Sequence, residues 1–352
     1  MSTNENKDKK AEITALQAIS AEDRKDWISL AFVQAGICVC VPAFLLGALL
    51  AEAMPIWPAI ISGSLGYLIV VVGMVATGMI GCDLGLASCT CCQAGFGKSG
   101  ARFIVSTIFA VNMIGWFGIQ NGVCGEAFSN AMLAMTGWDI PVVVSNTIWG
   151  IIMLLTAVYG VHALEKLDKI SIPLLMIIMC YGTFLAFKVY GTGNLNDEGT
   201  VQSMSFMSGV ALSFNFTAVG TITGPDYTRF QKSRKDTVKS VFYGVFPMGV
   251  ITLIMGIVLT KLSGQYDISM VLIEVGLPLL GIIALVISTW TTNSTNAYSA
   301  GLNIVMALKL KDNRRREATL ISGIVGIVLC DLGILGHVEG VLSLLSYVVC
   351  PV

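Results

Sequence analysis

Long apolar stretches alternate with short polar connections along most of the chain. A stretch of roughly 20 apolar residues can cross the hydrocarbon core of a bilayer as a helix. Because helices and closed barrels are the structures that satisfy every backbone group in lipid, the pattern predicts an all-α integral membrane protein. Ten spans are expected, at about 28–51, 56–80, 102–124, 140–161, 170–190, 203–224, 240–260, 273–297, 318–335 and 337–352.

Residues 1–27 are polar and charged, unlike the rest of the chain. They lack the apolar core of a cleavable signal peptide, so we expect a disordered cytoplasmic tail there. Residues 28–352 are expected to form one transmembrane transporter domain, with no separate soluble domain.

The first and the sixth predicted spans contain Gly and Pro near their centres. Gly36 and Pro42 interrupt the first span, and Gly220, Gly224 and Pro225 interrupt the sixth. Because Gly and Pro weaken helices, two broken helices at corresponding places predict a five-plus-five inverted-repeat transporter fold with its site at the breaks. The alternative is that these residues serve close packing or kinks, as is common in membrane helices. The two halves are spans one to five, about 28–190, and spans six to ten, about 203–352.

The eighth span carries a polar cluster within an otherwise apolar sequence. Ser288, Thr291 and Thr292 stand at i, i+3 and i+4, which places three hydroxyl oxygens on one helix face. Uncharged oxygens in this arrangement can replace part of the hydration shell of a small monovalent cation. The alternative is that the hydroxyls bond back to carbonyls of their own helix.

The third span places an aromatic ring and an amide on one face. Trp116 and Gln120 are four residues apart, so the indole and the amide share a side of the helix. An indole stacks on a flat heteroaromatic ring, the amide can bond to its edge, and Phe216 in span six can form the opposite wall. No Asp or Glu falls at the expected centre, which predicts a neutral, planar substrate, whereas the alternative for Trp116 is packing against small residues. Further amides that could complete edge recognition are Asn215, Asn293 and Asn296.

Composition and charge agree with a membrane protein and give its expected orientation. The chain is 55% hydrophobic and 12% charged, well below the charge of a soluble protein. Of the 21 Lys and Arg residues, all except Lys188 and Lys261 fall on one side of a ten-span arrangement. The positive-inside rule then places the N-terminus in the cytoplasm, with the protein in the plasma or inner membrane. The basic clusters are loop anchors, so no nucleic-acid partner is expected.

Cysteine and histidine usage does not predict an enzyme. The C-T-C-C segment lacks the paired spacing of a zinc site, and no catalytic constellation accompanies the two histidines. We therefore expect no cofactor other than a coupling ion. The residues concerned are Cys82, Cys89, Cys91, Cys92, His162 and His337.

Three motifs in order carry a family resemblance. They are Gly115-Trp-Phe-Gly118, Gly220-Thr-Ile-Thr followed by Asp226-Tyr-Thr-Arg-Phe230, and Trp290-Thr-Thr-Asn293 with Ala300-Gly-Leu302. From about residue 28 to the end, the chain resembles the nucleobase–cation symporter family of purine and cytosine permeases and of hydantoin and allantoin transporters. The bacterial cytosine permeases are the nearest group.

The resemblance implies a fold, a cation site and a substrate site. The family has twelve spans, the first ten forming the inverted repeat, and ten are expected in this chain. In the family a sodium ion is held by carbonyls of span one and side chains of span eight, and a base stacks between two aromatic rings. The amide at Gln120 matches the hydantoin-type arrangement, and Asn215 replaces what is often Gly or Ser. By resemblance the cation site comprises Gly36, Cys40, Ser288, Thr291 and Thr292, and the aromatic walls are Trp116 and Phe216.

The expected function is import of a neutral nucleobase, cytosine or a relative, by symport with Na⁺. Alternating access is expected from rocking of spans one, two, six and seven against the remaining spans. One alternative is a proton-coupled permease for hydantoin, allantoin or hydroxymethylpyrimidine, with Asp226 and Asp331 as relay candidates. Another is a truncated, non-transporting membrane protein, because the sequence stops at Val352. The sequence predicts no oligomeric state.

Overall fold

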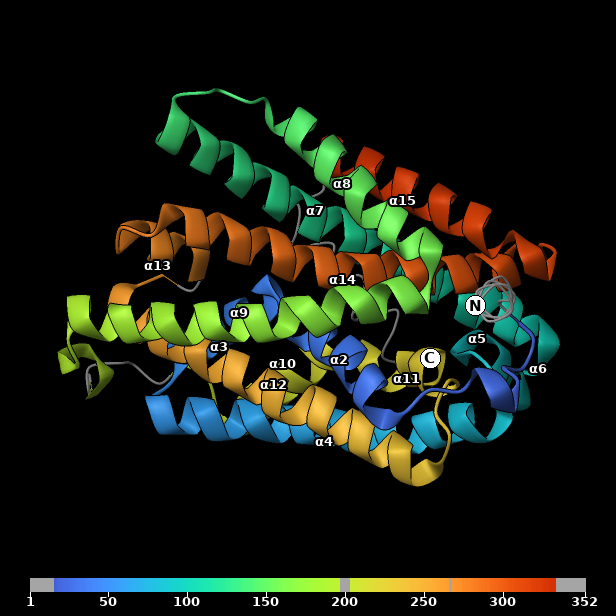
Figure 1. Ribbon diagram of the computed structural model, residues 1–352. Coiled ribbons are helices and arrows are strands. Elements are labelled where there is room, and N and C mark those ends of the chain that lie inside the picture. Colours follow the sequence, from blue (N-terminus) through green and yellow to red (C-terminus); the bar gives the residue numbers. More distant parts are fainter. Residues whose placement is uncertain (1–15, 197–202, 266–267, 334–352) are drawn as a thin grey trace.

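The computed structural model describes residues 16–196, 203–265 and 268–333, and these ranges are nearly all helical (Figure 1). The predicted tenth span and the end of the ninth lie outside the described residues. The helices are α2 (Trp27–Cys38), α3 (Val41–Ala53), α4 (Ile56–Leu84), α5 (Ser88–Cys91), α6 (Gln93–Gly100), α7 (Thr107–Thr136), α8 (Val142–Tyr159), α9 (Val161–Tyr190), α10 (Phe206–Thr217), α11 (Val219–Thr228), α12 (Arg234–Ser263), α13 (Ile268–Glu274), α14 (Pro278–Ala307) and α15 (Arg315–Asp331).

Several helical segments have the length and apolarity of membrane spans. Within the described ranges there are 6, or up to 7 if the bent pair α2–α3 counts as one. Helix α14 is not among them, although it has 30 residues, because its polar cluster lowers its hydropathy. An all-α membrane protein is confirmed, while the ten-span count remains a prediction.

The first predicted break is present between α2 and α3. The two helices meet at 53°, and the intervening Val39 and Cys40 have non-helical backbone angles. Pro42 lies in the first turn of α3, where its missing N–H costs nothing. Helix α2 therefore ends with carbonyls that have no partner in the next helical turn.

The second break is smaller than the sequence predicts. Helices α10 and α11 are separated only by Ala218, whose own backbone angles are helical, and the segment Phe206–Thr228 counts as one span. Pro225 lies inside α11 and cannot donate to the carbonyl of Thr221. The hydroxyl of Thr77 in α4 donates to that carbonyl at 2.5 Å, so a neighbouring helix supplies the missing donor.

The long helices form two groups with α9 between them (Figure 1). One group is α2–α3, α4, α10–α11 and α12, and the other is α7, α8, α14 and α15. Small residues bring α3 and α12 together, since a Cβ at Gly47 would lie 2.5 Å from the Leu253 carbonyl oxygen. The first group contains the spans that we expect to rock.

The polar segment before α2 is not wholly a disordered tail. Arg24 donates to the carbonyls of Cys82 and Gln231 at 2.8 and 3.0 Å, and Lys25 forms an ion pair with Glu165. The expectation of a disordered 1–27 tail is therefore wrong from residue 16 onward, because the Arg24 and Lys25 side chains bind carbonyls and a carboxylate of the helical domain.

Helix α9 begins nine residues before the predicted fifth span. Gly160, with φ 85°, ends α8 and allows α9 to start at Val161. The predicted spans leave 162–169 as a loop, but in the structure the charged residues near 165–169 belong to the first turns of a long helix. Because α9 starts earlier, the buried Asp168 lies within a helix and not in a connecting loop.

Candidate functional site

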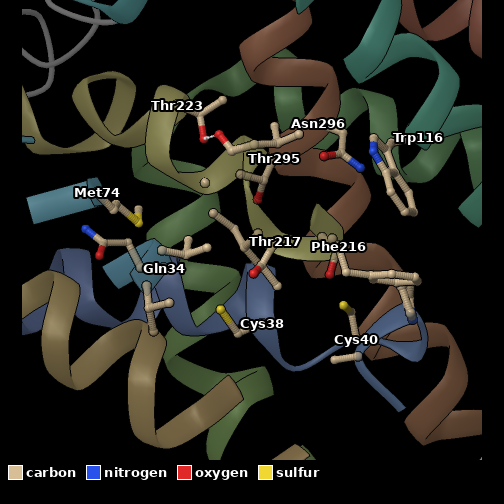
Figure 2. Close-up of a pocket in the computed structure, with 18 of the residues that line it drawn as sticks. Gln34, Cys38, Cys40, Met74, Trp116, Phe216, Thr217, Thr223, Thr295 and Asn296 are labelled. Atoms are coloured by element: carbon tan, nitrogen blue, oxygen red, sulfur yellow. Dashed lines mark hydrogen bonds between the residues drawn. The ribbon is translucent and has the colours of Figure 1, made fainter. Parts of the chain in front are cut away.

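A cavity lies where α2 and α3 separate, and it is lined by helices of both groups (Figure 2). The empty space around its lining, open mouth included, is about 890 Å³. The predicted site residues that line it are Cys40, Trp116, Gln120, Phe216, Thr292 and Asn296.

The two aromatic rings expected to hold a base are neighbours across the cavity. The ring centroids of Trp116 (α7) and Phe216 (α10) are 6.2 Å apart, with planes at 63°. This is an edge-to-face contact and not a pair of parallel walls. A flat ring held between them needs about 3.5 Å on each face, so one ring must rotate before a base can stack on both.

Amides approach the cavity from three helices. Gln120 follows Trp116 by one turn, lines the cavity and is 5% exposed. Asn296 of α14 lines the cavity and donates its Nδ2 to the side-chain Oδ1 of Asn293 at 3.3 Å. Asn293 itself donates to the Phe117 carbonyl at 3.0 Å and is not part of the lining.

The amide of Gln34 in α2 was not predicted as a site residue. It is fully buried and lines the cavity, and its Nε2 lies 3.5 Å from the Ser240 hydroxyl. Its Oε1 is buried and has no hydrogen-bond partner among the described residues. A polar residue before Gly36 in a broken span was a usable sequence signal.

Asn215 does not lie where the sequence analysis placed it. The structure puts Asn215 on the exposed side of α10, outside the cavity lining, whereas the adjacent Phe216 lines it. Successive helical residues differ by about 100° in direction, and here Phe216 and Thr217 face the cavity while Asn215 points away from it. Asn215 is corrected to a position outside the cavity.

The predicted cation residues meet around one backbone carbonyl. The hydroxyls of Thr291 and Thr292 lie 3.3 and 2.9 Å from the Gly36 carbonyl oxygen, across the interface between α14 and α2. Both hydroxyls also reach the Ser288 carbonyl at 3.0 Å, as the alternative predicts. The break at Cys40 removes the helical donor that Gly36 would otherwise meet, and the hydroxyls take its place.

The other two predicted cation ligands, Ser288 and Cys40, form hydrogen bonds within their own helices. The Ser288 hydroxyl donates to the Leu285 carbonyl at 3.0 Å, back along its own helix. The Cys40 carbonyl accepts from the Ala43 N–H at 3.0 Å, in the first turn of α3, and keeps one lone pair. The buried carbonyl and hydroxyl oxygens at Gly36 fit a hard monovalent cation. Within the described ranges there is no group of three or more His, Cys, Asp or Glu placed to hold a metal ion.

Asp168 is a buried carboxylate beside this group that the sequence analysis missed. It lies on α9, is fully buried, and neither oxygen has a partner among the described residues. A Cβ on Gly36 would lie 2.6 Å from its Oδ1, so the carboxylate touches the same glycine that the hydroxyls approach. Among the described residues, the cavity lining contains no Asp or Glu, as expected, and Asp168 lies beside Gly36 and outside that lining.

The two relay candidates lie away from the cavity lining. Asp226 Oδ1 accepts from the Ser88 N–H at 2.8 Å, at the start of α5, and Arg229 donates to the Tyr298 hydroxyl at 2.8 Å. Asp331 Oδ1 accepts from the Asn146 amide at 3.1 Å. These contacts join helices to one another.

A bent span, a cavity at the bend and several apolar helices define a helical membrane transporter. The sequence model of the family described as "permease for cytosine/purines, uracil, thiamine, allantoin" matches residues 19–352, and the chain belongs to this family of permeases. The family consists of transporters and not of enzymes.

Individual relatives agree with this assignment. The cytosine permease of Escherichia coli (strain K12) is 28% identical over 333 residues, 94% of this chain and 76% of the relative. The purine-uracil permease NCS1 of Arabidopsis thaliana is 25% identical over 338 residues, 86% of this chain and 55% of the relative. The structure of Mhp1, a nucleobase-cation-symport-1 family transporter, closed with bromovinylhydantoin bound, has TM-score 0.82 and 18% identity, covering 94% of this chain and 77% of that one. It shows the same fold.

Proposed function

We propose that this permease imports a neutral nucleobase, cytosine or a related purine or pyrimidine, by symport with Na⁺ across the cell membrane. The N-terminus lies in the cytoplasm, on the side of the basic connections. The main support is Thr292, whose side chain lines the cavity and whose hydroxyl also reaches the Gly36 carbonyl. Because Thr292 belongs to both the cavity wall and the oxygen group at Gly36, a ligand bound at one site can change the affinity of the other.

The cavity suits a flat ring with a hydrogen-bonding edge. Trp116 and Phe216 offer aromatic faces, and Gln34, Gln120 and Asn296 offer amides in the same cavity lining. Stacking on aromatic side chains accepts any base, since every base has a π face. Discrimination therefore depends on which amide donors and acceptors meet the edge of the ring.

The oxygen group at the break suits sodium. The oxygens of the Gly36 carbonyl and of the Thr291 and Thr292 hydroxyls can coordinate a bound sodium ion. For this the hydroxyls turn their protons toward the Ser288 carbonyl, which both already reach at 3.0 Å. The bend between α2 and α3 is then held to α14 through oxygen ligands, in place of hydrogen bonds.

Alternating access follows from the two helix groups. The group containing α2–α3 and α10–α11 rocks against the group containing α7 and α14, with the cavity and oxygen cluster at their interface. Each ligand favours the state in which the other binds, and such reciprocal coupling is typically about 1–3 kcal/mol.

Uptake of radiolabelled cytosine by cells that lack their own permease tests this proposal. Sodium in the medium is replaced by choline at constant pH, and unlabelled uracil, adenine, allantoin, hydantoin and a hydroxymethylpyrimidine compete in parallel. Sodium-dependent uptake blocked by a subset of bases is the expected result. Uptake that follows pH and ignores sodium would favour the proton-coupled alternative, and no uptake of any of these compounds by protein in the membrane would favour a non-transporting one.

A further inference from the structure

Asp168 is an unusual residue to find in the interior of this protein. It is 0% exposed, and neither carboxylate oxygen has a hydrogen-bond or ion-pair partner among the described residues. An unpaired charge in the interior is strongly unfavourable unless a counter-ion accompanies it. The nearest basic residue along α9, Lys169, is engaged elsewhere, with Glu165 at 2.7 Å and Ser29 at 3.1 Å.

The Asp168 carboxylate lies against Gly36. Its Oδ1 and Oδ2 lie 2.6 and 3.2 Å from the point that a Cβ on Gly36 would occupy. The carbonyl of the same glycine is 2.9 Å from the Thr292 hydroxyl. Three helices, α2, α9 and α14, therefore bring a carboxylate, a carbonyl and hydroxyls to a single residue, and α9 contacts both of the others.

We propose that Asp168 is the anionic ligand of the cation site at Gly36. The bound ion is a monovalent metal cation, whose single charge balances the single carboxylate, while the Gly36 carbonyl and the hydroxyls of Thr291 and Thr292 complete its oxygen shell. A metal cation would engage both carboxylate oxygens, which have no hydrogen-bond partner among the described residues. This inference rests on the proposed cation symport and names a ligand beyond those that the sequence predicts.

The absence of a side chain at Gly36 makes room for the Asp168 carboxylate. Any Cβ there would collide with the carboxylate, so glycine lets α9 approach close enough for Asp168 to share the ion with the backbone of α2. Through the bound ion, the carboxylate then links α9, which lies between the two helix groups, to α2 of the bent span.

Sodium binding to purified protein without any base tests the proposal. Thermal unfolding is followed while NaCl replaces choline chloride at constant ionic strength, with LiCl and KCl as further arms. The wild type is expected to show saturable stabilisation by sodium. Asp168→Asn should need about ten- to a hundredfold more sodium for half of the effect, the usual cost of disturbing a metal site. Asp331→Asn, which alters a membrane carboxylate on α15, is the matched control and should keep the wild-type sodium dependence.

Asp168→Ser carries the same prediction if the Asn variant does not fold. Unchanged half-maximal sodium in a folded Asp168 variant, or no cation response in the wild type, would overturn the proposal. Because no base is present, a positive result holds even if nucleobase uptake fails, and nucleobase uptake can succeed while this result is negative. The two proposals are thus separable.

Discussion

The hydroxyl of Thr292 lies 2.9 Å from the carbonyl oxygen of Gly36, and this contact joins the polar cluster of α14 to the bend between α2 and α3. The same threonine lines the cavity that contains Trp116 and Gln120. A cation held at Gly36 and a ring held in the cavity would therefore share a wall. In this fold coupling needs no long pathway, because the two proposed sites are adjacent.

Replacing Thr292 with alanine should raise the sodium concentration needed for half-maximal uptake by about tenfold, since one oxygen near Gly36 is lost. Uptake is measured over a sodium series at constant ionic strength. Thr292→Ser retains the hydroxyl and should stay near wild type. Thr289→Ala is the control, because that hydroxyl donates along its own helix to Leu285 at 2.9 Å. An unchanged sodium requirement in Thr292→Ala would remove this residue from the cation site.

Replacing Gly36 with alanine should abolish sodium-stimulated uptake and lower thermal stability by about 1–3 kcal/mol, the usual cost of overpacking. The new methyl group would lie 2.6 Å from Asp168 Oδ1, so the carboxylate must move away from Gly36. Gly95→Ala is the control, because a Cβ there meets nothing within 4 Å. Wild-type uptake and melting in Gly36→Ala would show that close approach at this glycine is not required.

Replacing Trp116 with alanine should weaken base binding by about 1–3 kcal/mol, which is roughly ten- to a hundredfold, as expected for a lost stacking surface. Binding is measured by displacement of a labelled base in saturating sodium. Trp116→Phe should retain part of the affinity. Trp149→Phe is the control, since that ring packs on Phe128 with centroids 5.3 Å apart, outside the cavity lining. Equal affinity in Trp116→Ala would exclude stacking on this ring.

Replacing Tyr298 with phenylalanine should destabilise the protein by about 1–3 kcal/mol, because the buried Arg229 guanidinium loses an acceptor at 2.8 Å. Thermal unfolding in detergent measures this change. Tyr243→Phe changes an exposed tyrosine on α12 and should melt as the wild type does. If the two variants melt alike, the hydrogen bond to Arg229 contributes little to stability.

Periodicity and helix-breaking residues predicted much of the fold and part of the site. Gly36 and Pro42 marked the bend because their effect is local and independent of packing. Trp116 and Gln120 share a cavity because four residues make about one helical turn. The sixth-span break was overestimated, since Thr77 of α4 offers a hydroxyl to the carbonyl that Pro225 cannot serve.

Helix ends and burial were harder to predict. The charged residues of early α9 resemble a loop in sequence, yet Lys25 from before α2 pairs with Glu165, so the helix continues through them. Asp168 was missed for this reason, because its burial depends on the contact with Gly36 and not on its neighbours in sequence. Asn215 was misplaced because adjacency to Phe216 was taken for a shared face.

The most direct test is accumulation of labelled base by the purified protein in proteoliposomes. An inward sodium gradient is imposed at equal pH on both sides, with the membrane potential clamped. The account predicts that the base rises above its external concentration and that the rise collapses when the sodium gradient is dissipated. Equilibration without accumulation, or accumulation driven equally well by a proton gradient in the absence of sodium, would contradict sodium-coupled transport.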